Sequence, residues 1–96
     1  MPCCYIIYSP SIDQYYVGAT HGDFDERLSS HKSGKYSASY TAKVSDWEEY
    51  IVIKVDSYSH ALAVERHIKR MKSKVYVANL KKYPELREKL IEITKA

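Results

Sequence analysis

The stretch CCYIIYSPSIDQYYVGAT, residues 3–20, decides the fold of this 96-residue chain. Residues 3–8 are β-branched and aromatic, residues 9–14 are rich in turn formers, and residues 15–20 are again typical of a strand. Two strand-like segments joined by a short turn predict a β-hairpin. The adjacent Cys3 and Cys4 should point to opposite faces of their strand, which makes a bond between them improbable. We interpret both as reduced structural thiols, with redox or intermolecular roles as the alternative.

The segment after the hairpin predicts a short helix. Asp23 is a typical N-cap, with Glu26 three residues further on as in a capping box, and Gly34 should end the helix after about Ser33. Residues 35–45 are rich in Ser, Lys and Tyr and are expected to form a loop. Four residues share one face of the predicted helix by their spacing: Phe24, Arg27, Leu28 and His31.

The second half of the chain predicts one strand and two helices. Residues 50–55, YIVIKV, are the most strand-like stretch, Ser57 or Ser59 caps a helix to about Lys72, and a shorter helix begins at Pro84. The longer helix has a stripe suited to burial, formed by Ala61, Val64, Ile68 and Met71. We therefore expect an α/β fold in the order β-β-α-β-α-α, with a small, mainly antiparallel three-stranded sheet flanked by helices.

Length and composition narrow the class of protein. The chain is long enough for a single domain, residues 1–96, with one compact site. An apolar fraction of 45% and a charged fraction of 28% are ordinary for globular proteins and exclude collagen-like and disordered chains. Met1 is followed by no apolar run and no cleavage-site pattern, so we expect a cytoplasmic protein that does not insert into a membrane.

The positive charge is concentrated in one segment. The whole chain has a net charge of +3, whereas residues 65–82 contain seven Lys or Arg and one Glu, a net charge of +6. A phosphate backbone is the partner that this pattern favours, although a basic helix face is also often solvated surface. The expected nucleic-acid contacts are Arg66, Lys69, Arg70 and Lys72.

Three groups of residues, in order along the chain, together resemble the GIY-YIG nucleases. Tyr5 and, eleven residues later, Tyr16-Val17-Gly18 look like the paired signatures that name the family. The segment RLSSH, residues 27–31, is similar to the family's R-L-x-x-H segment, and ALAVERHIK, residues 61–69, resembles the segment around the family's metal-binding glutamate. The resemblance covers nearly the whole chain and is closest to the short stand-alone subgroup, which is little more than the catalytic domain.

The chain departs from the family pattern at two places. Cys3 and Cys4 stand where the first signature has Gly and Ile, and His21-Gly22 lengthens the approach to the first helix. Because the signature Tyr5 is present, we interpret the cysteines as side-chain changes in a strand that leave the chemistry intact.

The resemblance implies a metal-dependent endonuclease that hydrolyses DNA phosphodiester bonds. It implies Tyr5 as the general base toward the attacking water and Arg27 as the group that stabilises the phosphoryl charge. It also implies that Glu65 holds one divalent metal, Mg²⁺ or Mn²⁺. Tyr16 and His31 complete the expected catalytic set, His31 by relaying a proton or orienting Tyr5.

Several interpretations stay open at this stage. Asn79, fourteen residues beyond Glu65, falls near a position where many family members carry a site asparagine, but it could also be a loop cap. Glu65 could pair with Lys69 at i+4, and Tyr5 could be a packing residue. The alternatives for the whole protein are a catalytically inactive nucleic-acid-binding module of the same fold and a protein-interaction domain. The sequence leaves open whether the DNA is single-stranded, duplex, branched or damaged, and which oligomeric state the protein adopts.

Overall fold

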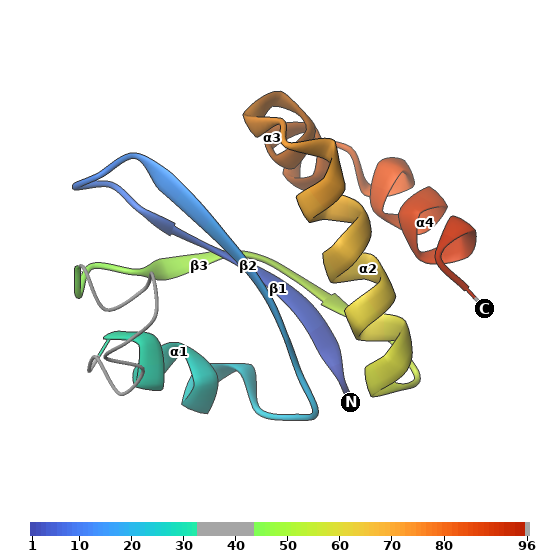
Figure 1. Ribbon diagram of the computed structural model, residues 1–96, viewed down its shortest axis with the longest axis horizontal. Coiled ribbons are helices and arrows are strands. Elements are labelled where there is room, and N and C mark those ends of the chain that lie inside the picture. Colours follow the sequence, from blue (N-terminus) through green and yellow to red (C-terminus); the bar gives the residue numbers. More distant parts are fainter. Residues whose placement is uncertain (33–43, 96) are drawn as a thin grey trace.

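The N-terminal hairpin forms as the sequence predicts (Figure 1). The computed structural model describes residues 1–32 and 44–95. Strand β1, Cys3–Ser9, pairs antiparallel with β2, Gln14–Thr20, with Cys3 opposite Thr20 and Ser9 opposite Gln14. Asp13 closes the turn in a left-handed conformation with φ of 49°, which Asp tolerates better than most residues.

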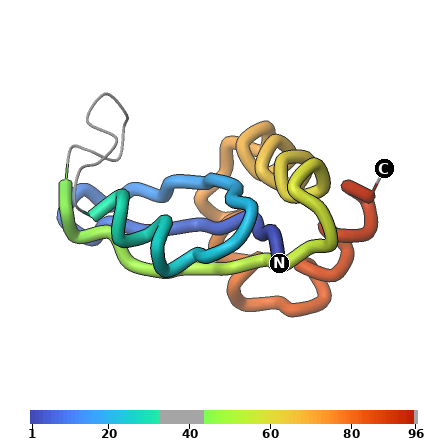
Figure 2. The backbone as a smooth tube through the Cα atoms, turned by 90° about the horizontal axis from the view of Figure 1, so that it is seen from below, coloured from blue at the N-terminus to red at the C-terminus, as the bar shows by residue number. Residues whose placement is uncertain are grey.

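Strand β1 is the centre of the sheet. Strand β3, Glu48–Lys54, pairs antiparallel with the other edge of β1, so the strand order is β2-β1-β3 (Figure 2). The residues of β1 from Cys3 to Ile7 are all buried. A strand covered on both faces needs a continuous apolar run rather than an alternating one, and that is the pattern of this stretch.

Four helices complete the fold: α1, Phe24–Lys32; α2, Tyr58–Met71; α3, Lys74–Lys82; and α4, Pro84–Ile93. The predicted cap of α1 is confirmed, because the Asp23 carboxylate accepts the N–H of Asp25 at 2.9 Å and of Glu26 at 3.3 Å. Ser57 caps α2 through the N–H of His60 at 3.1 Å. The predicted helix end at Gly34 and most of the loop predicted over residues 35–45 lie outside the described residues.

The predicted fold class is confirmed, and helix α3 is an addition to the predicted order. Its first turn contains Val75 and Val77, and β-branched residues are poor helix formers, so propensity does not indicate a helix here. Two local features nevertheless favour one. The Ser73 hydroxyl accepts the N–H of Tyr76 at 3.1 Å, and Leu80 is buried one turn after Val77.

The sheet separates two apolar clusters. On one face, which we call the α2 face, β1 contributes Cys4 and Ile6 to a cluster with α2, α3 and α4. On the other, the α1 face, β1 contributes Cys3, Tyr5 and Ile7 to a cluster that contains Trp47 and the α1 residues Phe24 and Leu28. Figure 1 shows α1 on one side of the strands and the other three helices on the other side.

The two cysteines lie on these opposite faces as expected. Both are free and buried, and burial raises the pKa of each thiol above its usual value. Among the described residues, no helix is long and apolar enough to cross a membrane.

The α2-face cluster predicts a large cost for truncating the central strand. Ile6 is 0% exposed, so Ile6→Ala should lower the free energy of unfolding by about 2–5 kcal/mol through lost burial and a cavity. The matched control is Ile93→Ala, because Ile93 is 56% exposed and its truncation should change stability by less than about 0.5 kcal/mol. Urea unfolding measures both, and equal effects would contradict this assignment of the core.

Candidate active site

The hairpin register places Tyr5 directly opposite Gly18 on the α1 face. A Cβ built on Gly18 would lie 2.5 Å from the Tyr5 hydroxyl oxygen, which is closer than such atoms approach each other. Glycine is therefore required at position 18, because only a residue without a side chain lets the Tyr5 ring lie against the backbone of β2.

Two side chains of α1 converge on the Tyr5 hydroxyl. His31 Nε2 lies 2.9 Å from the hydroxyl oxygen, and Arg27 Nε donates to the same oxygen at 3.3 Å. Arg27 can only donate, so the hydroxyl oxygen is its acceptor, whereas the direction of the hydrogen bond with His31 Nε2 depends on the tautomer of the imidazole. Tyr5 is 1% exposed and His31 is 2% exposed, so this hydrogen-bonded group is shielded from bulk water.

The environment keeps His31 neutral. Burial lowers the pKa of His31 below its usual value of 6.5, and the nearby charge of Arg27 lowers it further. In the tautomer that carries its proton on Nδ1, a neutral imidazole has Nε2 as an acceptor for the Tyr5 hydroxyl. Arg27 and His31 are four residues apart on α1, which confirms that they share the predicted face.

Tyr16 borders the same group. Its ring centroid lies 5.2 Å from that of His31 and 6.5 Å from that of Trp47. Lys69 Nζ, from α2, lies 5.8 Å from the centroid of the Tyr16 ring. The structure thus brings Tyr5, Tyr16, Arg27 and His31 together, although they come from three different elements.

Glu65 lies on α2, and its buried neighbours pack on the opposite face of the sheet from Tyr5. Its side chain is 16% exposed and accepts from Lys69 Nζ at 2.9 Å. Lys69 therefore connects Glu65 with Tyr16. In residues 1–32 and 44–95, no group of three or more His, Cys, Asp or Glu side chains is placed to hold a metal.

The donor chemistry at Glu65 fits a metal held by a single carboxylate. The Lys69 ammonium already occupies a cation position beside the Glu65 oxygen. Mg²⁺ and Mn²⁺ prefer hard oxygen donors, and Mg²⁺ usually binds through one or two carboxylates plus waters and phosphate oxygens.

Asn79 and two of the basic residues lie away from the Tyr5 group. Asn79 is on α3, where its backbone carbonyl accepts the N–H of Tyr83 at 2.9 Å, and its side chain has no hydrogen bond to the described site residues. Arg66 and Arg70 are exposed and each follows a buried α2 residue by two positions, which is about 200° around a helix. They therefore project away from the sheet.

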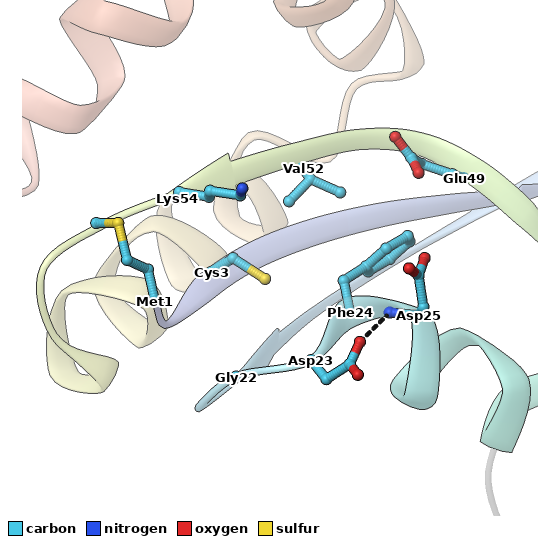
Figure 3. A pocket seen from close by; sticks show the side chains of 9 residues that line it. All are labelled: Met1, Cys3, Gly22, Asp23, Phe24, Asp25, Glu49, Val52 and Lys54. Carbon is cyan, nitrogen blue, oxygen red and sulfur yellow. Dashed lines mark hydrogen bonds between the residues drawn. The ribbon is translucent and has the colours of Figure 1, made fainter.

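A cleft of about 500 Å³ lies beside the Tyr5 group, between β3 and the start of α1 (Figure 3). Phe24 lines it and packs against Tyr5, with ring centroids 5.4 Å apart. Its lining carries the carboxylates of Asp23, Asp25 and Glu49, and these are opposed by the Lys54 ammonium and the N-terminal ammonium of Met1, so the cleft is only weakly acidic.

These elements define an α/β domain with a buried group suited to acid–base chemistry. The family model described as the GIY-YIG catalytic domain matches residues 1–82. The chain therefore belongs to the GIY-YIG family, whose domain is typically a nuclease domain. These nucleases act on DNA and generally depend on a divalent metal. A search of the curated proteins and a search of the solved structures gave no match.

Sequence reasoning missed two residues that shape the site. Gly18 stands out in the sequence only as part of the Tyr16-Val17-Gly18 signature, and Trp47 does not stand out from its surroundings. In the structure Gly18 makes room for Tyr5, and Trp47, 0% exposed, packs beside Tyr16. The turn could have indicated Gly18, because a hairpin that pairs Ser9 with Gln14 also pairs Tyr5 with position 18.

The buried neutral imidazole predicts a pH dependence of stability. The folded state binds a proton on His31 less readily than the unfolded chain does. The contribution of the neutral His31 to the free energy of unfolding is therefore complete above about pH 6.5 and is lost as the pH falls through the lowered folded pKa. Urea unfolding at about pH 7.5 and about pH 5 should show a larger acid-induced loss for the wild type than for His31→Gln, which lacks the titrating group. Equal losses in the two proteins would contradict a buried neutral His31.

Proposed function

We propose that this protein is a metal-dependent endonuclease that hydrolyses DNA phosphodiester bonds with Tyr5 as its general base. The observation that carries the proposal is the Tyr5 hydroxyl held between His31 Nε2 and Arg27 Nε. A tyrosine phenol ordinarily ionises near pH ~10, so it acts as a base near neutral pH only where a partner takes its proton and a charge stabilises its anion. His31 serves the first purpose and Arg27 the second.

The proton moves in two steps in this mechanism. Tyr5 gives its proton to His31 Nε2, and the resulting phenolate is stabilised by the Arg27 guanidinium. The phenolate then takes a proton from the attacking water, whose oxygen forms a bond to phosphorus as the bond to the 3′-oxygen breaks. The 3′-oxygen leaves with the electron pair of that bond and takes a proton from solvent, and His31 releases its proton, which restores the site. A guanidinium has five N–H donors, so Arg27 can serve both Tyr5 and a phosphoryl oxygen. Tyr16, beside His31, lies where it can position the imidazole or the phosphate.

Glu65 is the residue that we propose to hold the metal. One divalent ion, Mg²⁺ or Mn²⁺, supplies Lewis-acid stabilisation of the phosphoryl charge when it is bound. Lys69 pairs with Glu65 at 2.9 Å. When a metal binds the Glu65 carboxylate, the Lys69 ammonium is released to pair with a phosphate.

Tyr5→Phe tests the base. The variant keeps the ring packed against Gly18 and Phe24 and removes only the hydroxyl, at a cost of about 1–3 kcal/mol in unfolding free energy for the two lost hydrogen bonds. Cleavage of DNA with Mg²⁺ or Mn²⁺ should fall by about 10²–10⁴-fold, the usual effect of removing a general base. Single-turnover cleavage assays and thermal melting measure the two effects.

The matched control is Tyr8→Phe on the same strand. The Tyr8 hydroxyl donates to Asp13 at 2.6 Å on the exposed turn, so its loss should leave cleavage unchanged. A folded Tyr5→Phe protein with wild-type turnover would eliminate Tyr5 as the base. DNA binding by the wild type without metal-dependent cutting would favour the inactive binding module instead.

Glu65→Gln tests the metal ligand. The change keeps the size of the side chain and removes the charge, so metal-dependent cleavage should disappear while DNA binding persists or tightens. Loss of the Lys69 pair alone should cost only about 0.2–0.5 kcal/mol, so the variant should stay folded.

Glu92→Gln is the control for this charge change. Glu92 lies on α4 and, like Glu65, pairs with a lysine, in this case Lys95 just beyond the end of the helix, at 4.0 Å. The Glu92→Gln variant should cut DNA as the wild type does. Retained cutting by a folded Glu65→Gln protein would overturn the assignment of Glu65, and loss of folding would show that Glu65 is structural.

A further inference from the structure

A second hollow, of about 190 Å³, lies at the outer edge of β2, where α2 meets α3. It does not include Tyr5, Arg27 or His31. Its floor is apolar and consists of Tyr15, Val17, Ile68 and Val77. Its rim carries three cationic side chains, and we therefore call it the lysine groove: Lys69, Lys72 and Lys74.

The connection between the two helices places these lysines around the groove. Lys72 follows α2 in a left-handed conformation with φ of 48°, and α3 begins two residues later at Lys74. Lys74 Nζ donates to the backbone carbonyl of Asp13 at 2.8 Å and lies 3.5 Å from its carboxylate, so it ties the start of α3 to the hairpin turn; a phosphate has to compete with this exposed ion pair. The rim of the groove is thus built into the packing of helices on the sheet.

An apolar floor within a cationic rim suits an unpaired nucleic-acid strand better than a duplex. A duplex presents its phosphates outward and keeps its bases stacked inside, so it would use the lysines and leave the floor unused. An unpaired strand exposes the faces of its bases, which stack on aromatic rings. Tyr15 offers such a ring, although its centroid already lies 4.8 Å from that of Tyr8 and 4.9 Å from that of Tyr50, which meets it edge-on. Lys81 Nζ lies 4.4 Å from the Tyr50 centroid.

Lys69 joins this groove to the Tyr5 group. It lines the groove, pairs with Glu65 and lies 5.8 Å from the ring centroid of Tyr16. Strand β2 is an edge strand, so a bound chain can pass over it from the groove to the α1 face without crossing the sheet. The cleft between β3 and α1 carries three carboxylates beside Lys54 and the N-terminal ammonium, whereas the lysine groove carries three ammonium groups, so the β2 edge is the better approach for phosphates.

We propose that the lysine groove binds an unpaired segment of DNA and presents the adjoining phosphodiester to Tyr5. This inference rests on the proposed nuclease function and specifies its substrate as a strand that is single over the segment next to the cut. The phosphates of that segment bind Lys69, Lys72 and Lys74, and one base lies on Tyr15.

Binding of labelled single-stranded oligothymidylate, measured by fluorescence anisotropy in EDTA so that nothing is cut, tests the groove. The wild type should bind it more tightly than a hairpin duplex with the same number of phosphates. In Lys69→Gln/Lys72→Gln the log-log salt dependence of binding should flatten by ~0.7 per lost contact, about 1.4 in all. The matched control is Arg66→Gln/Arg70→Gln, which removes the same charge from the side of α2 turned away from the sheet and should change the slope by less than half as much.

Tyr15→Leu tests the stacking independently of charge. It should weaken single-strand binding by roughly ten- to a hundredfold with an unchanged salt slope, whereas Tyr15→Phe, which keeps a ring, should restore the affinity. Thermal melting of each variant shows whether it is folded. If Tyr15→Leu does not fold, the comparison of Lys69→Gln/Lys72→Gln with Arg66→Gln/Arg70→Gln still tests whether the lysine groove binds the strand.

The outcomes separate this inference from the proposed function. Equal slope changes in the two double variants, or tighter binding of the duplex, would overturn the groove even if the wild type cuts DNA. Selective single-strand binding by a protein that cuts no DNA with Mg²⁺ or Mn²⁺ would support the groove and overturn the nuclease.

Discussion

The contact between the Tyr5 ring and the bare backbone of Gly18 depends on one hairpin register, and the rest of the candidate site depends on that contact. A shift of one residue would send Tyr5 to the α2 face and bring a side chain opposite the ring. In the observed register the hydroxyl lies where Arg27 and His31 of α1 both reach it. The position of α1 along this face is fixed by the partly buried Phe24 and Leu28, which pack against the cluster around Tyr5.

The sheet gives the protein two unlike sides. The α1 face holds the hydrogen-bonded phenol, and the α2 face carries the packing of three helices together with most of the basic charge. The two sides meet at the β2 edge through Lys69, which lines the groove on the α2 side and lies near the Tyr16 ring. A central strand that is buried on both faces makes this division stable, because β1 contributes side chains to both clusters at alternate positions.

Local chemistry in the sequence was sufficient for the hairpin and for the cap of α1 at Asp23, and it narrowed the start of α2 to Ser57 or Ser59, since each depends on neighbours within a few residues. Local chemistry was not sufficient for α3. Its β-branched residues have low helix propensity, and the helix is stabilised instead by the burial of Val77 and Leu80. Spacing placed Arg27 and His31 on one face, but their meeting at a single oxygen is a tertiary contact. Which cationic side chains of α2 face β2 likewise depends on how that helix packs on the sheet, and local patterns in the sequence do not determine that packing.

The division of the sheet also has a consequence for its two cysteines. Cys3 and Cys4 are consecutive, yet each is enclosed by a different cluster, and burial disfavours the reactive thiolate of both. Cys4 is 0% exposed, so an alkylating reagent reaches it only when the α2 to α4 layer has lifted. Cys3 is 2% exposed but lines the cleft beside α1, so a reagent can approach it through that cleft. Two adjacent thiols of one strand thus report on different events: Cys4 on local opening of a helical layer, and Cys3 on entry into the cleft.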